Sequence, residues 1–541
     1  MSNYLKKNLQ VKLNPPQSDP LDERQIKNSA GGYVYPVTEW VMLDRFLILG
    51  TEGGSYYATE KKLTLENVDN VKKCVAQDGK RVVDRVVEIS HSGRSPKNDP
   101  ALLVLALCAA SDKEEVRTHA LANLHKVARI GTHLFHFLEY VNQLRGWGRG
   151  LKTTIQDWYL RKKVDSLTEQ VVKYQSRDGW SHRDVLRLCH AKSKDPIVNS
   201  IFKFAVKKEL DETTPRLIQT YITIQSMLGE GEDGKKKTPT TKQVKEVSKL
   251  IIASNLTREM LPTEFLNYAE IWDALLQEMP MTAMIRNLGN MSKVDLVTPM
   301  SNAEMMIKTR LHDQDKLKKA RVHPIQVLSA LLTYKSGRGV RGKGEWAVNQ
   351  PIVDALEDAY YLSFGNVVPT GKRFYLGVDV SGSMDSGEIS GIPGLSPRMG
   401  AAAMAMVTVR IESNYCIRGF CDEMVDLHIT AKDTIANVWH KTNIADFGGT
   451  DCALPMIDAL KNKIPVDIFI ILTDSETWAG NIHPSRALTN YRKGMGIPAK
   501  QVVVGMTSVG FSIADPTDAG MMDVIGFDTA TPQLISDFAV N

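Results

Sequence analysis

Along most of this chain, hydrophobic residues recur at three- and four-residue steps, the period of an amphipathic helix. Pro262, Pro280, Pro299 and Pro324 fall at or near the expected helix boundaries. From about residue 36 to 365 we therefore expect successive helices, stacked as pairs in a HEAT-like solenoid. No strict sequence period is visible, so a large irregular all-helical domain is the alternative. The clearest periodic stretches are 116–145, 158–174, 241–255 and 323–337.

The pattern changes near residue 368, where short apolar runs begin to alternate with helical stretches. Such alternation predicts a doubly wound, mostly parallel α/β sheet. We therefore place a helical domain at residues 1–368, starting with an extended arm over 1–35, and an α/β domain at 369–541. Strands are expected at 374–380, 417–420, 425–430, 466–474 and 501–506, and helices at 398–413 and 531–540.

Charge is divided unevenly between these two parts. The 541 residues carry a net charge of +5. Residues 370–541 hold 13 Lys and Arg against 19 Asp and Glu, whereas residues 1–369 hold 54 against 43. A basic surface attracts polyanions, of which nucleic acid is the commonest, although a lysine-rich solvated surface explains the charge equally well.

The sequence lacks the signals that mark several functional classes. No apolar core follows the first lysines, and no run of 18 apolar residues occurs, so we expect neither a secretory signal nor a membrane span. None of the six cysteines forms a CxxC pair, which favours reduced cytosolic thiols. The charged loop at 229–240 has the outline of a phosphate loop but carries Lys236 where Ser or Thr is required, which argues against an ATP-dependent chelatase.

The strongest chemical signal is a set of oxygen side chains that follow predicted strands. The sequence DVSGS (379–383) ends the first strand, GGTD (448–451) forms a tight loop, and Asp474 ends the apolar strand 466–474. Ligand sites in open α/β sheets lie at the carboxyl ends of the strands. Carboxylates and hydroxyls without His or Cys suit a hard cation, and Mg²⁺ fits best. The expected ligands are Asp379, Ser381, Ser383, Thr450 and Asp474. A pocket held only by hydrogen bonds is the alternative, and Glu476 is expected to be solvated.

A second signal is the basic, aromatic segment 145–193. Glycines in 146–150 would let the backbone approach phosphates, and Lys173 and Arg177, four residues apart, are expected to share a helix face near its C-terminal end. Ser181 is expected to cap the next helix, with Asp184 as its capping-box partner. Two cationic helix ends meeting at one turn would form a phosphate cradle. The candidate RNA-binding residues are Arg145, Arg149, Lys152, Lys173, Arg177, Arg187 and His190.

These motifs together resemble one known family. The segments GWGRGLK (146–152), KYQSRDGWSHRDVLRLCH (173–190) and DVSGSM (379–384), with the long helical part before the last, are similar to the TROVE-domain family of Ro ribonucleoprotein autoantigens. The order DxSxS, GGT and TD also resembles the metal-ion-dependent adhesion site of von Willebrand A domains. The resemblance implies a closed ring of HEAT-like repeats followed by a von Willebrand A domain with the five metal ligands named above.

The resemblance also implies a function. Family members bind small noncoding Y RNAs on the basic outer surface of the ring, and single-stranded 3′ ends of misfolded noncoding RNAs in its central hole. In such proteins, RNA-contacting residues match Lys173, Arg177 and His190. We therefore expect a non-enzymatic protein of RNA quality control in the cytoplasm, with or without an additional nuclear pool. Neither a membrane nor DNA is expected as a partner, and the metal site would serve a protein with an acidic group. A protein-only adaptor is the competing interpretation.

Overall fold

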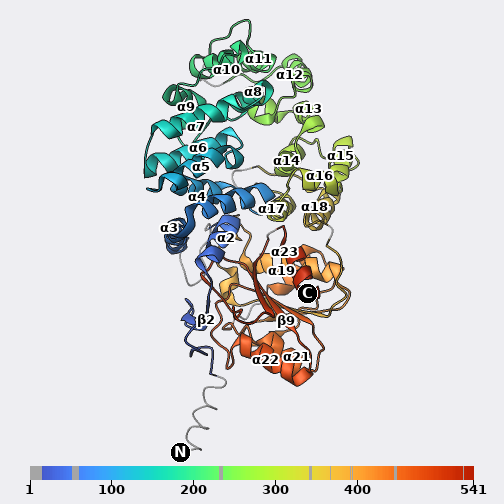
Figure 1. Ribbon diagram of the computed structural model, residues 1–541. Coiled ribbons are helices and arrows are strands. Elements are labelled where there is room, and N and C mark those ends of the chain that lie inside the picture. The colour runs from blue at the N-terminus through green and yellow to red at the C-terminus, as the bar shows by residue number, and fades with distance from the viewer. Residues whose placement is uncertain are drawn as a thin grey trace, which may run out of the picture.

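The structure is a computed structural model that describes residues 15–50, 60–230, 236–339, 344–365, 367–389, 392, 394–443, 448–527 and 529–541. Figure 1 shows two parts, a tall array of helices and a smaller α/β domain below it. Residues 231–235 of the predicted loop at 229–240 lie outside the described residues. Among the described residues, no helix is long and apolar enough to span a bilayer.

The helical array closes on itself. It rises along one side of Figure 1, crosses the top and descends on the other side, so that its last helices return to its first. At the meeting point, His323 Nε2 lies 2.9 Å from the carbonyl oxygen of Arg94, and Gln326 Nε2 donates to the carbonyl of Pro96 at 2.7 Å. The predicted ring of helices is therefore confirmed.

The helices of the ring are α2 (Glu39–Leu49), α3 (Glu60–Ser92), α4 (Asp99–Ala109), α5 (Glu114–Val127), α6 (Gly131–Leu144), α7 (Arg149–Leu160), α8 (Val164–Lys173), α9 (His182–Cys189), α10 (Pro196–Lys207), α11 (Arg216–Ser226), α12 (Thr241–Ser254), α13 (Ala269–Glu278), α14 (Met281–Lys293), α15 (Asn302–Leu311), α16 (Gln314–Lys319), α17 (Pro324–Lys335) and α18 (Gln350–Leu362).

Local sequence accounts for many of these boundaries. Thr240 caps α12 and forms a capping box with Gln243, and Pro324 occupies the first turn of α17, where its missing amide hydrogen costs nothing. The periodic stretch 116–145 divides between α5 and α6. At the start of α6 only glycine fits, because a Cβ on Gly131 would lie 2.9 Å from the side chain of Tyr174.

The C-terminal domain is built on a six-stranded sheet of order β11-β9-β8-β5-β6-β7, parallel except for β7. Helices α19 and α23 lie on the face toward the ring, and α21 and α22 cover the other face (Figure 1). The predicted doubly wound sheet is confirmed. Its elements are β5 (Phe374–Asp379), α19 (Pro397–Ile411), β6 (Tyr415–Phe420), β7 (Met424–Val425), α20 (Ile435–Thr442), α21 (Leu454–Lys461), β8 (Ile468–Thr473), α22 (Pro484–Met495), β9 (Lys500–Gly505), β11 (Met521–Ile525) and α23 (Thr531–Val540).

One predicted strand is wrong over most of its length. The stretch 425–430 contributes only Val425 to β7, because the chain then turns and His428 adopts a left-handed conformation with a φ of 48°. The edge strand β11, which pairs in parallel with β9, was not predicted.

The first described residues pack on the C-terminal domain rather than within the ring. Residues 15–36, here called the N-terminal strap, contain β1 (Ile26–Lys27) and β2 (Tyr33–Pro36). Strand β2 pairs antiparallel with β10 (Phe511–Ser512) of the C-terminal domain. Just after the strap, the buried Arg45 of α2 donates to the carbonyl of Phe511 at 3.0 Å and forms a 2.5 Å ion pair with Asp523. The strap therefore packs on the C-terminal domain, although it lies before the predicted domain boundary at residue 368.

Candidate metal centre and nucleic-acid interface

The five candidate metal ligands gather at the carboxyl end of the parallel sheet. β5 and β8 are neighbouring central strands, so the loops that follow them leave the same edge of the sheet. Every one of the candidate side chains is almost completely buried, and the group comprises Asp379, Ser381, Ser383, Thr450 and Asp474.

Hydrogen bonds hold this group together. Thr473 donates from Oγ1 to Asp379 Oδ2 at 2.6 Å, and the backbone amide of Ser381 donates to Asp379 Oδ1 at 3.0 Å. The hydroxyl oxygens of Ser381 and Ser383 lie 3.1 Å apart. The GGT loop joins the same edge, because the carbonyl of Thr450 accepts from the backbone amide of Trp478 at 2.9 Å.

Negative charge is unfavourable on the two carboxylates of this group, because both are buried. Burial and the neighbouring Asp474 raise the pKa of Asp379 to about 7, and burial also raises the pKa of Asp474. Asp474 Oδ2 is buried without a hydrogen-bond partner, which is costly for a carboxylate oxygen. The described residues contain no cluster of three or more His, Cys, Asp or Glu that suits a metal, so any ion would need the hydroxyls as well. Two carboxylates with three hydroxyls fit Mg²⁺.

Two further side chains support the loops of the site. Arg398 is fully buried, donates to the carbonyl of Ser381 at 3.1 Å and pairs with Asp385 at 2.8 Å. Glu476, expected to be solvated, is completely buried, and the backbone amide of Ala30 in the N-terminal strap donates to its Oε2 at 3.1 Å. The expectation of a solvated Glu476 is therefore wrong.

The N-terminal strap lies directly against the loops that carry Thr450 and Asp474. Gln17 is completely buried, and its Nε2 donates to Asp451 Oδ1 at 2.7 Å, while its Oε1 accepts from Thr477. Asn28 donates to the carbonyl of Thr477 at 2.8 Å. Gln17 escaped the sequence analysis because no local motif marks a glutamine that reaches a loop so far away in the chain.

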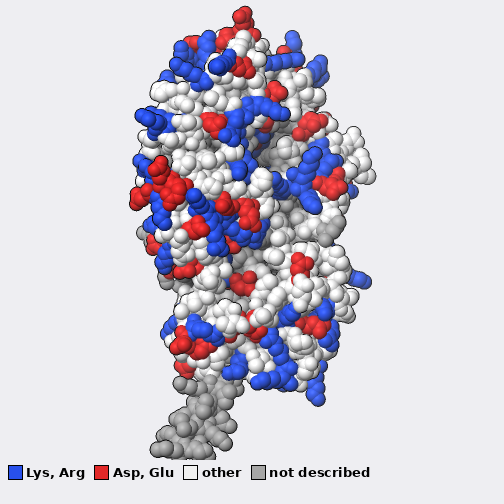
Figure 2. Space-filling view, in the orientation of Figure 1, with Lys and Arg blue, Asp and Glu red and all other residues white. Residues whose placement is uncertain are grey.

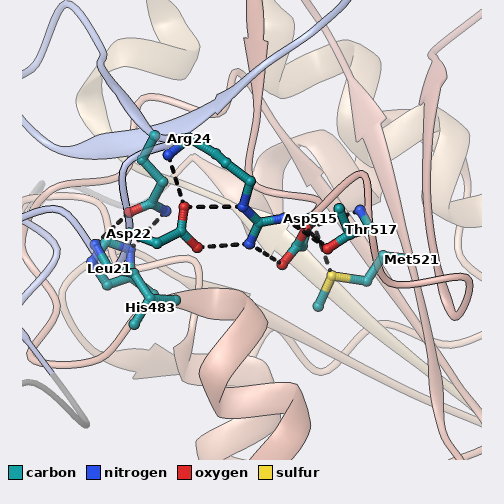
Figure 3. A network of polar contacts seen from close by, with 8 residues as sticks. Leu21, Asp22, Arg24, His483, Asp515, Thr517 and Met521 are labelled. Carbon is teal, nitrogen blue, oxygen red and sulfur yellow. Dashed lines mark hydrogen bonds and ion pairs between the residues drawn. The ribbon is translucent and has the colours of Figure 1, made fainter. Parts of the chain in front are cut away.

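An exposed ionic network fastens the outer side of the strap (Figure 3). Arg24 forms ion pairs with Asp22 at 2.6 Å and with Asp515 at 2.9 Å, and donates to Thr517 at 2.7 Å. His483, labelled in the same figure, makes a further contact with the strap: its Nε2 lies 2.9 Å from the carbonyl oxygen of Asp19. The strap is therefore held to the C-terminal domain both by buried hydrogen bonds and by an exposed ionic network.

The local structure around Lys173 and Arg177 differs from the predicted one. α8 ends at Lys173, and Arg177 lies in a short hairpin of β3 (Ser176–Arg177) and β4 (Trp180–Ser181). The two turn residues, Asp178 and Gly179, both have positive φ, as a two-residue hairpin requires. The prediction that Lys173 and Arg177 share a helix face is therefore wrong. The predicted capping box of Ser181 and Asp184 at the start of α9 is confirmed.

Lys173 and Arg177 differ in how accessible they are. Arg177 is 58% exposed and its nearest carboxylate is Asp178, at 3.6 Å. Lys173 is only 15% exposed, pairs with Glu169 at 3.4 Å and lies over the ring of Tyr174. A polyanion would reach Arg177 directly and would compete with Glu169 for Lys173.

Contacts between aromatic rings hold the glycine-rich loop against the hairpin. Trp147 packs on Trp180 with ring centroids 5.8 Å apart, and the indole of Trp180 donates to Glu139 at 2.9 Å. Arg145 and Arg149 are exposed on either side of Trp147. This stack places both arginines beside the hairpin that carries Arg177.

The remaining candidates lie along the adjacent helix pair. Gln156 of α7 donates to the carbonyl of Cys189 at 2.6 Å, which holds α7 beside the end of α9. Arg187 and His190 are exposed there, and Lys152 is half-buried one turn from Gln156. The seven candidates therefore occupy contiguous helices and one hairpin. Figure 2 shows Lys and Arg spread over the ring, interspersed with Asp and Glu.

Other residues of this segment belong to the core. Trp158 and Tyr159 are buried, and so is His182, which lies 2.8 Å from the hydroxyl of Tyr159 and 3.1 Å from the carbonyl oxygen of Gln170. Burial lowers the pKa of His182 to about 4, so it stays neutral at physiological pH. These groups position α9 and are not available to a ligand.

Comparison with known proteins agrees with this architecture. The TROVE domain model matches residues 26–255 and 247–372, and the Ro60 vWA domain model matches residues 373–539. The RNA-binding protein RO60 of Deinococcus radiodurans is 41% identical over 529 residues, 97% of each chain, and that of Caenorhabditis elegans is 35% identical over 98% of this chain and 92% of its own.

A solved structure is similar throughout. The crystal structure of the Deinococcus radiodurans RO (RSR) protein matches with a TM-score of 0.69 and 39% identity, and covers 93% of this chain and 99% of that one. Matches of this extent in sequence and in structure show that the chain belongs to the Ro60 family of proteins, in which a TROVE domain precedes a von Willebrand A domain.

Proposed function

We propose that this chain binds RNA without modifying it. The observation that carries the proposal is a set of exposed cations on helices and a hairpin that contact one another. It comprises Arg145, Arg149, Arg177, Arg187 and His190, here called the outer basic surface. Cations spread over several helices neutralise phosphates along a nucleic acid rather than at a single point. The printed names of the relatives, which are RNA-binding proteins, support RNA as the polyanion.

Two classes of RNA fit the architecture. A folded small RNA of the Y type would lie across the outer basic surface, because phosphate contacts recognise shape more than sequence. A single-stranded 3′ end of a misfolded noncoding RNA would enter the ring, and a duplex would be too wide to follow it. Competition between the two would link RNA stability to RNA quality control. We place this activity in the cytoplasm, with a nuclear pool as the alternative.

We also propose that the cluster at the carboxyl end of the sheet binds Mg²⁺. Asp379, Ser381, Ser383, Thr450 and Asp474 would hold the ion, which would supply a coordination position for an acidic group of a protein partner. The buried and unpaired Asp474 Oδ2 supports this assignment. Beside the GGT loop, Trp478 is 41% exposed and would provide an apolar contact for the same partner.

A titration of RNA binding at two salt concentrations tests the main proposal. The probes are a Y-type stem-loop and a duplex with a single-stranded 3′ tail. The variants are Lys173→Ala/Arg177→Ala/His190→Ala and a control in the other domain, Lys461→Ala/Lys463→Ala.

We expect salt-sensitive binding of both RNAs by the wild type and the control, and weaker stem-loop binding by the triple variant. Wild-type affinity no better than the ~10⁻⁴ to 10⁻⁶ M of a generic basic surface would reject the proposal. A protein-only adaptor would then be the better interpretation.

A further inference from the structure

The hairpin that carries Arg177 rests on α6. Its strand β4 is held there by Trp180, whose indole donates to Glu139 at 2.9 Å. Its turn is held by a second contact, in which Nδ1 of His136 meets Oδ2 of Asp178. His136 and Glu139 are three residues apart in α6 and so share one face of the helix. This face therefore contacts both the turn and the second strand of the hairpin.

The carboxylate of Asp178 lies between His136 and Arg177. Its Oδ2 contacts Nδ1 of His136, whereas its Oδ1 lies 3.6 Å from Nε of Arg177. A separation of 3.6 Å is too long for a hydrogen bond. Asp178 is therefore bound to His136 and only faces Arg177.

These three side chains become more accessible toward the tip of the hairpin. The side chain of His136 is 17% exposed, that of Asp178 is 32% exposed and that of Arg177 is 58% exposed. A polyanion that approaches from solvent would reach the guanidinium of Arg177, whereas His136 lies behind Asp178 and would not touch the polyanion.

His136 is itself oriented from its other side. Oδ1 of Asp99, in the first turn of α4, lies 3.6 Å from Nε2 of His136. Helices α4 and α6 pack against each other, so this carboxylate belongs to the framework of the ring. A carboxylate therefore faces each nitrogen of the imidazole, which directs Nδ1 toward the hairpin. An imidazole that carries its hydrogen on Nδ1 donates to the carboxylate of Asp178.

Without His136, Asp178 would have Arg177 as its nearest cation. Opposite charges at this distance attract, so the released carboxylate would pair with the guanidinium. A paired Arg177 offers less charge to a phosphate, and the carboxylate beside it would repel that phosphate. The contact on α6 thus keeps a negative charge away from the cation that RNA would reach.

We propose that His136 is a positioning residue of the RNA surface, whose imidazole holds the carboxylate of Asp178 on α6 and thereby leaves the guanidinium of Arg177 to an RNA phosphate. This role rests on the proposed function, because Arg177 must contact RNA for it to matter. It adds to the outer basic surface a residue that acts only through its neighbour.

A simple tether would behave differently. If His136 served only to tie down the turn, loss of either partner of the contact would loosen the hairpin and weaken RNA binding. If His136 restrains Asp178, loss of the carboxylate itself is harmless. Asp178→Asn preserves the turn, because Asn-Gly favours the two positive φ values that residues 178 and 179 adopt.

Filter binding of a Y-type stem-loop to the full chain at several salt concentrations tests the proposal. The variants are His136→Ala, Asp178→Asn, the two combined, and Arg177→Ala as the reference. His312→Ala is the matched control, because it removes a contact of the same kind, from Nε2 to Asp358 Oδ2 at 3.0 Å. That contact joins α15 and α18, on the other side of the ring from α6 (Figure 1). Thermal unfolding checks that each variant is folded.

We expect His136→Ala to bind the stem-loop about three- to tenfold more weakly than the wild type, because a phosphate loses a charged hydrogen bond. Its plot of log affinity against log salt concentration should become shallower by up to about one, the effect of one lost phosphate contact. Asp178→Asn should bind at least as tightly as the wild type, and the double variant should match Asp178→Asn. His312→Ala should match the wild type.

Weaker binding by Asp178→Asn, or a double variant no better than His136→Ala, would overturn the proposal in favour of a tether. Asp178→Asn changes only the exposed turn, so it decides between the two even where His136→Ala is unstable. Full affinity of His136→Ala together with weak binding by Arg177→Ala would overturn the role of His136 and leave the proposed function intact. Full affinity of Arg177→Ala would reject both.

Discussion

The side chain of Gln17 donates a 2.7 Å hydrogen bond to Asp451, although 434 positions separate the two residues. Through this bond the N-terminal strap holds the GGT loop in place. Asp451 follows Thr450 directly, and Thr477, the other side-chain partner of Gln17, lies three residues beyond Asp474. The strap is therefore part of the framework of the candidate metal centre.

Replacing Gln17 should loosen both loops at once. In Gln17→Ala the buried Asp451 and Thr477 lose a hydrogen-bond partner, and we expect a loss of about 1–3 kcal/mol in the free energy of unfolding of the C-terminal domain. Chemical denaturation followed by tryptophan fluorescence would measure it. Ser18→Ala, at the exposed neighbouring position, is the control, and an equal effect of both substitutions would contradict the role given to Gln17.

Asp474→Asn should change the response to metal and the stability of the metal-free protein in opposite directions. The substitution removes a ligand, so the rise in melting temperature that Mg²⁺ causes in the wild type should shrink or vanish. In EDTA, however, the variant should be at least as stable as the wild type, because one of two neighbouring buried carboxylates is neutralised. Asp426→Asn, at an exposed position, is the control. A Mg²⁺ response of Asp474→Asn equal to that of the wild type would remove Asp474 from the ligand set.

Glu169→Gln should strengthen RNA binding. The substitution frees Lys173 from its 3.4 Å ion pair and removes the negative charge beside it. Exposed ion pairs contribute about 0.2–1 kcal/mol, so we expect an increase in affinity of about 1.5- to 5-fold, larger at low salt. Filter binding with a Y-type stem-loop would measure it, with the exposed Glu246→Gln as the control. Unchanged or weaker binding by Glu169→Gln would indicate that Lys173 does not face the RNA.

His182 should make the ring sensitive to acid. Its pKa in the folded chain is about 4, below the ordinary 6.5, so folding favours the neutral imidazole. Its contribution is complete above pH 6.5 and is lost as the pH falls toward 4, with a total of about 3 kcal/mol. Urea unfolding of the helical signal at pH 7 and pH 4.5 would compare the wild type with His182→Gln. The stability gap between them should narrow at the lower pH, and a gap that does not change with pH would contradict this account.

The sequence predicts a structural feature best when the residues that determine it lie close together in the chain. Asp379, Ser381 and Ser383 could be placed at a sheet edge because a buried strand and a short loop determine their position. The hairpin at Ser176–Ser181 was missed because the helical period was extended past Lys173, although Asp178-Gly179 is a strong turn signal. The role of Gln17 depends on a strand pairing between β2 and β10 that no neighbouring residue encodes.

The N-terminal strap also has a consequence for the order of events on the ribosome. Its Gln17 is synthesised more than four hundred residues before its partners Asp451 and Thr477. At about 5–20 residues per second, roughly 20–90 seconds pass between synthesis of the strap and synthesis of its docking site. The ring can assemble while the chain is still being made, whereas the strap can dock only after the residues around Thr477 have been synthesised. A nascent chain that stops early therefore exposes its first residues, and this would distinguish it from the finished protein.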